Sequence, residues 1–78
     1  MPRYFTHFVD GEDKILDPDG KEMPLESVPA YALMSARDCI AGDVMNGVVD
    51  LRYHLEVQDE NDQIVHVLAF IDAVNVIT

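Results

Sequence analysis

The fold of this chain is decided by a stretch near its middle, Val28–Asn46, with the sequence VPAYALMSARDCIAGDVMN. Apolar residues recur there every three to four positions, which predicts a helix with one face on a core: Val28, Ala32, Leu33, Ala36, Cys39, Ile40 and Val44. Ser27 is suited to cap the helix N-terminus, and Pro29 is tolerated in the first turn. Gly47 can adopt the left-handed conformation that commonly ends a helix.

Two strand-pair segments flank this helix, Arg3–Asp17 before it and Arg52–Phe70 after it. The first pair turns at the sequence DGED and returns over Lys14–Asp17, where a proline ends the strand. In the second pair, Arg52–Gln58 alternates between polar and apolar residues and Ile64–Phe70 is its partner. The sequence therefore predicts an α+β domain of order β-β-α-β-β, an antiparallel sheet with one long helix packed on one face.

The second strand pair predicts a specific register. A short connection with Asn61 or Asp62 in the left-handed conformation would place these residues opposite each other: Val57 and Val65, Leu55 and Val67, Glu56 and His66. Together with the helix face, this register predicts the core: Leu55, Val57, Val65, Val67, Ala36 and Ile40. The residues after the second pair, 71–78, are expected to form either one more short strand or an ordered tail.

Composition limits the partners of the chain. Its 78 residues make one domain, 1–78, and 49% hydrophobic residues are enough for a core. The net charge of −10, from 15 acidic and 5 basic residues, repels phosphate backbones and anionic membranes, so neither nucleic acid nor membrane is an expected partner. The single Cys39 suits a reducing compartment, and the N-terminus lacks the apolar core of a signal peptide. A cytoplasmic location is expected.

The sequence offers few groups for chemistry. His54, Glu56 and His66 would share one sheet face in the predicted register, and two imidazoles with a carboxylate can bind zinc, but a solvated polar face explains the same residues. The acidic runs around Gly11, Gly20 and Asn61 have calcium-type ligands, yet turns demand the same residue types. No nucleophile elbow or phosphate loop is present, so we expect neither an enzyme nor a bound cofactor or metal.

A set of short motifs is spread along nearly the whole chain: Met1-Pro2-Arg3-Tyr4-Phe5, His7, Asp10-Gly11, Asp17-Pro18, Gly20, Ala32, Ala36-Arg37-Asp38, Glu56-Val57 and Asp59-Glu60. Together these motifs resemble those of a family of small uncharacterised bacterial proteins that begin MPRYFFH. Thr6 stands where that family usually has an aromatic residue, and Asp62 where it often has Gly. The resemblance implies a compact bacterial domain and assigns no catalytic residue. In strand and helix order alone, the chain also has a looser likeness to antitoxin domains that neutralise RNA-cleaving toxins.

These observations favour a non-enzymatic cytosolic interaction or regulatory module, and the alternative is an acidic, antitoxin-like inhibitor of a basic protein. A homodimer is also expected, because the helix carries a second stripe opposite its core face: Tyr31, Met34, Asp38, Ala41, Met45 and Val48. Scattered surface apolar residues are common, so the stripe could also be solvated. The predicted interface residues are Tyr31, Met34 and Met45, in preference to a sheet face where Ile64, Leu68 and Phe70 would be uncovered.

Overall fold

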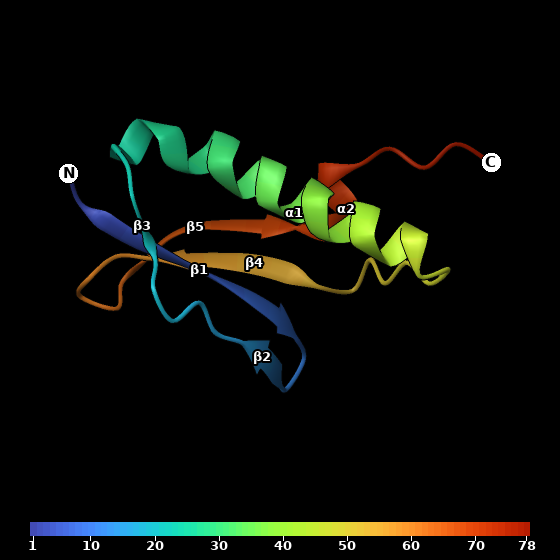
Figure 1. Cartoon of the computed structure of the whole chain (residues 1–78), viewed down its shortest axis with the longest axis horizontal. Coiled ribbons are helices and arrows are strands. Elements are labelled where there is room, and N and C mark those ends of the chain that lie inside the picture. Colours follow the sequence, from blue (N-terminus) through green and yellow to red (C-terminus); the bar gives the residue numbers. More distant parts are fainter.

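The computed structural model of the chain describes all residues, 1–78. It confirms the predicted α+β class: an antiparallel sheet of five strands with one long helix between its early and late strands (Figure 1). The elements are β1 (Arg3–Asp10), β2 (Asp13–Ile15), β3 (Lys21–Glu22), a 3-10 turn (Leu25–Ser27), α1 (Val28–Met45), β4 (His54–Gln58), β5 (Ile64–Ala69) and α2 (Phe70–Ala73).

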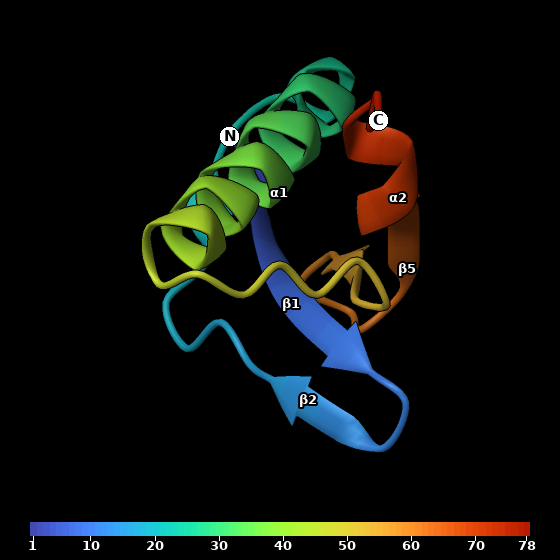
Figure 2. The same ribbon diagram turned by 90° about the vertical axis from the view of Figure 1, so that its right-hand side faces the viewer.

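The sheet has the strand order β2-β1-β4-β5, and β3 pairs with the N-terminal end of β1. β1 therefore lies between β4 on one edge and the broken pair β2 and β3 on the other. Figure 2 shows α1 and α2 on the same side of the sheet, with β2 away from both helices. The return strand β2 is shorter than the predicted Lys14–Asp17, and a further short strand, β3, forms between it and the helix.

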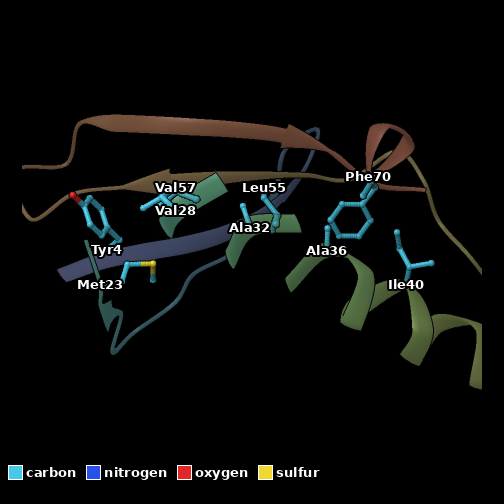
Figure 3. Close-up of a cluster of buried hydrophobic side chains, with 10 residues drawn as sticks. Tyr4, Met23, Val28, Ala32, Ala36, Ile40, Leu55, Val57 and Phe70 are labelled. Atoms are coloured by element: carbon cyan, nitrogen blue, oxygen red, sulfur yellow. The ribbon is translucent and has the colours of Figure 1, made fainter. Parts of the chain in front are cut away.

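The core lies between α1 and the facing side of β1 and β4 (Figure 3). Two small residues, Ala32 and Ala36, are fully buried and bring the helix close to the sheet. The ring of Phe70 fills the space under α1, with its centroid 6.0 Å from that of Phe8 and 5.7 Å from that of Tyr53. The buried cluster consists of Tyr4, Met23, Val28, Ala32, Ala36, Ile40, Leu55, Val57, Phe70 and Ala73.

The predicted register of the second strand pair is wrong by one residue. Leu55 lies opposite Leu68, Val57 opposite His66 and Glu56 opposite Val67, with a bulge beside Val57 and Gln58. Beside the turn the register is as predicted, with Gln58 opposite Ile64, so the shift comes from the bulge. Within the turn, the Asp59 carboxylate accepts hydrogen bonds from the amides of Asn61 and Gln63, and Asp62 has the predicted positive φ. A shift of one residue reverses the faces of a strand. Val65 and Val67 are therefore exposed, whereas Phe70 is buried and Leu68 is half-buried.

The ends of α1 follow the sequence only in part. Ser27 is not the predicted side-chain cap, because it already belongs to the preceding 3-10 turn and its hydroxyl bonds no helix amide. The C-terminal end is as predicted: Gly47 has a φ of 83°, its amide donates to Val44 O, and the amide of Val48 donates to Asp43 O. On the predicted core face, Val44 is exposed. The last residues form neither a strand nor a simple tail, since α2 precedes an irregular segment, 74–78.

Candidate functional site

A single carboxylate bridges the break between β2 and β3. Oδ2 of Asp17 accepts a hydrogen bond from the amide of Thr6, at the position along β1 where a continuous strand would have paired. Its Oδ1 accepts from the amides of Asp19 and Gly20. Gly20 has a φ of 67°, and a Cβ there would lie 2.8 Å from the Phe5 ring, so the position requires glycine. These contacts hold the segment after β2 against β1 and fix one wall of a groove.

The groove runs between α1 and the β1–β2 hairpin. It consists of two adjacent cavities with volumes of about 250 and 280 Å³, which share Phe8 and Ile15 as lining residues. The first cavity is also lined by Thr6, Leu16, Asp17, Tyr31 and Ser35, and the second by Cys39, Asp43 and Tyr53. We call the whole feature the α1–β2 groove. It exists because α1 contacts β4 and β5, whereas β2 lies away from the helix (Figure 2).

One flank of α1 forms the helical wall of the groove. Tyr31, Ser35, Cys39 and Asp43 follow each other at intervals of four residues, so their side chains lie on the same side of the helix. The ammonium group of Lys21 lies 4.9 Å from the Tyr31 ring centroid, which is a cation–π contact at the Tyr31 end of the groove. Burial, reinforced by the Asp43 carboxylate, raises the pKa of the Cys39 thiol, so this cysteine is not an activated nucleophile.

The opposite end of the groove is acidic. The pKa of Tyr53 is raised, first by loss of solvent and then by the four nearby carboxylates of Asp10, Asp50, Asp13 and Asp43. Among them, Arg52 forms an ion pair with Asp50: its guanidinium bonds both oxygens of Asp50 at 3.0 and 2.9 Å, and these hydrogen bonds lower the pKa of Asp50 to about 2. The Tyr53 end therefore carries more negative than positive charge.

A buried hydroxyl lies at the floor of the groove. Thr6 is only 6% exposed, and its Oγ1 atom has no hydrogen-bond partner in the chain. A buried polar group without a partner costs roughly 1–3 kcal/mol. The groove thus combines apolar walls, an acidic end and one unsatisfied hydroxyl.

The predicted interface residues occupy two different sides of α1. Met34 and Met45 are 68% and 86% exposed, and they lie on the outward side of the helix with Asp38 and Ala41. Tyr31 is half-buried and lines the groove instead. β5 offers a third surface, because it is the last strand of the sheet and has no partner on its outer edge. Its exposed side chains are Ile64, Val65 and Val67.

The structure separates the three residues considered as metal ligands. His54 and Glu56 share the sheet face away from α1, with Nε2 and Oε1 3.1 Å apart. His66 lies opposite Val57 and so belongs to the face under α1. The expectation of a shared face is wrong because of the one-residue shift in register. No three His, Cys, Asp or Glu side chains come together as a metal site.

A family model described as a domain of unknown function, DUF6894, matches residues 3–71 of the chain. The chain belongs to this family. This membership confirms the expected relationship to small uncharacterised proteins, and the match includes both walls of the groove. Comparison with curated proteins found no match, and comparison with solved structures found none either. No helix of this DUF6894 domain has the length and apolar character needed to span a bilayer.

Sequence reasoning missed the groove because its lining residues come from both strands of the first hairpin, from the helix and from the segment just before β4. Tyr31 was assigned to the outer stripe and Cys39 to the core, although both lie between these two sides. The four-residue spacing of Tyr31, Ser35, Cys39 and Asp43 is a signal in the sequence that could have revealed a third side. Nothing local indicates that β2 lies away from α1.

Proposed function

We propose that this DUF6894 domain is a non-enzymatic protein-interaction or regulatory module of the bacterial cytoplasm that forms a homodimer. The cytoplasmic part of the proposal is supported by a lone, half-buried cysteine, which suits a reducing compartment. The bacterial part is supported by the sequence resemblance described above. The interaction role depends on one observation, the apolar character of α1 on the side that faces away from the sheet.

α1 is apolar on nearly all sides. Among its 18 residues only Arg37, Asp38 and Asp43 are charged. A helix that covers a sheet from outside ordinarily carries a polar outer face, and a helix that is apolar all round is ordinarily buried. Met34, Ala41 and Met45 are instead exposed, at the spacing of a helix–helix seam. A second copy of the chain that packs α1 against α1 would bury these side chains, and flexible Met residues adapt well to such contacts.

Light scattering on the wild type and on a Met34→Glu/Met45→Glu double variant tests the proposal. We expect a dimeric wild type and a monomeric variant, because two added charges on each copy would face each other across the seam. The matched control is Asn61→Asp/Gln63→Glu, which adds the same charge in the exposed turn between β4 and β5. A monomeric wild type would refute the homodimer. A variant that stays dimeric would move the interface to the free edge of β5.

An acidic inhibitor of a basic protein is the second candidate function, and the acidic end of the groove favours it. A chain with a net charge of −10 attracts a basic partner at long range, and the complex should weaken as salt rises. Affinity purification from the native cell, followed by mass spectrometry, distinguishes the candidates. An inhibitor should recover one small basic protein at low salt, whereas a self-associating module should recover its own chain.

A further inference from the structure

We propose that the α1–β2 groove binds a segment of another protein in which apolar and basic side chains lie close together. This inference rests on the proposed role as an interaction module, and it names a second surface and the chemistry of its partner. It does not require the homodimer, because the outward stripe of α1 and the groove are on different sides of the helix.

The apolar part of the groove determines the apolar part of the partner. The two cavities share Phe8 and Ile15, so they lie side by side, and together they are of a size that takes several side chains. Ile15 and Leu16 are 60% and 62% exposed on its rim. Exposed apolar residues next to a cavity, bordered by polar groups, are typical of binding surfaces. Apolar side chains of a partner would cover both residues and contact the rings of Phe8 and Tyr53.

The charges at the Tyr53 end determine the basic part of the partner. None of the four ion pairs in the chain involves Asp10, Asp13 or Asp43. The nearby Lys14 contacts Glu56 on the opposite sheet face, and Arg52 is occupied by Asp50. A lysine or arginine that follows an apolar side chain into the groove would meet these carboxylates at the edge of an apolar surface, where charge pairs are stronger than in bulk water.

The Thr6 hydroxyl adds a polar contact for the partner. It is buried and has no partner in the chain, and Thr6 lines the first cavity beside Ser35. The oxygen is closed to solvent in the free chain, so a rotation of the Thr6 side chain on binding would turn it toward an amide or carbonyl group of the bound segment. A polypeptide supplies such groups along its whole backbone.

A second copy of this chain is a poor occupant. Its basic residues are Arg3, Lys14, Lys21, Arg37 and Arg52, no two of which are adjacent, and every copy adds ten negative charges. Nucleic acid has the wrong sign of charge. The groove therefore fits a basic segment of a different protein.

Fluorescence anisotropy with a labelled synthetic peptide of alternating leucine and lysine tests the proposal. Three forms of the full chain are compared: the wild type, a groove variant and a control variant. The groove variant is Ile15→Ser/Asp43→Asn, which removes one exposed apolar side chain and one carboxylate from the groove. The control is Ile64→Ser/Asp38→Asn, which makes the same two chemical changes on β5 and on the outward side of α1. Thermal melting of all three forms confirms that each is folded.

We expect the groove variant to bind the peptide about tenfold more weakly than the wild type, and the control to bind within about twofold of it. A peptide of alternating leucine and glutamate should not bind. Equal weakening in both variants would show nonspecific adsorption to an acidic chain and would overturn the proposal, as would a wild type that does not bind the leucine–lysine peptide.

Cys39 provides an independent readout of position, because it lines the second cavity. Alkylation of Cys39 should slow when the leucine–lysine peptide is bound, and an unchanged rate would overturn the proposal. Light scattering separates the two proposals. A wild type that is dimeric but does not bind the peptide would refute the groove proposal and leave the interaction module. A wild type that is monomeric but binds the peptide would refute the homodimer and leave the groove proposal.

Discussion

The two flanks of α1 lie over the same sheet, yet one is closed and the other is open. On the α2 flank, Phe70 fills the space between the helix and the sheet, and Arg37 Nε donates a 2.9 Å hydrogen bond to Ala73 O. On the groove flank, two cavities lie between the helix and the β1–β2 hairpin. The closed flank is sealed by apolar packing, whereas the far wall of the open flank is held by hydrogen bonds to Asp17.

The difference shows what keeps a cavity open in so small a domain. Only 13 of the 78 residues are buried, so the core has little apolar surface to spare for a second packed flank. Hydrogen bonds can hold the segment after β2 in place without packing it onto the helix. The open flank is thus compatible with a stable fold, because the residues that position its wall are not the ones that pack the core.

Removal of the Phe70 side chain from the closed flank should have the largest effect on the stability of the domain. Phe70→Ala removes a fully buried ring and should cost about 3–5 kcal/mol of unfolding free energy, which approaches the whole stability of a small domain. Urea denaturation should show a variant that is largely unfolded without denaturant. The control is Ile71→Ala, one residue further along α2, where the side chain is exposed and the change should stay within about 0.5 kcal/mol. Similar midpoints for both variants would contradict the role of Phe70.

Loss of the carboxylate that bridges β2 and β3 should have a smaller but clear effect. Asp17→Ala leaves the amides of Thr6 and Gly20 without their acceptor and should cost about 1–3 kcal/mol. Asp19→Ala, in the same turn, is the control, because no hydrogen bond involves the Asp19 carboxylate. Urea midpoints measure both costs. Hydrogen exchange at the Thr6 amide should accelerate in the Asp17 variant only, and exchange at the wild-type rate would show that the carboxylate does not hold this wall.

The closed flank was more predictable from sequence than the open one. Periodicity identified Val28, Ala32, Ala36 and Ile40 as buried, because burial of a helix face depends on local spacing. Alternation likewise placed Leu55 and Val57 in the core. The faces of β5 were predicted wrongly, because a bulge beside Val57 and Gln58 shifts the register by one residue, and alternation alone does not reveal a bulge. Because of this one-residue shift, Phe70 is in the core and the predicted Val67 is not. The closure of the α2 flank by Phe70 was therefore not predicted either.

The open flank could not be predicted, because it depends on where the first hairpin lies relative to the helix. The sequence indicated turns around Gly11 and Gly20, and both glycines have the positive φ that such turns require. It did not show that the Asp17 carboxylate replaces a strand residue between β2 and β3. That contact joins residues 11 positions apart and determines the groove wall. The interface predicted at Tyr31, Met34 and Met45 stays a prediction, with Tyr31 now part of the groove.

The floor of the open flank should tolerate a change that a packed core would not. Thr6→Val replaces a buried hydroxyl that has no partner with a methyl group of similar shape. We expect the unfolding free energy to change by less than about 1 kcal/mol and to rise if it changes, because an unsatisfied polar group is removed. Urea denaturation measures this. A loss greater than about 2 kcal/mol would show that the Thr6 hydroxyl has a partner in solution and that the groove floor is closed.

The smallest expected effect is on the reactivity of Cys39, and it tests whether the open flank is accessible. The thiolate is the reactive form, and burial together with the Asp43 carboxylate raises the pKa of this thiol. Asp43→Asn removes one of the two causes, so the pKa should fall and alkylation at a fixed pH near 8 should accelerate. Asp38→Asn, on the outward side of the helix, should leave the rate unchanged. A Cys39 that reacts only under denaturing conditions would mean that the groove closes in solution, and the two flanks of α1 would then not differ.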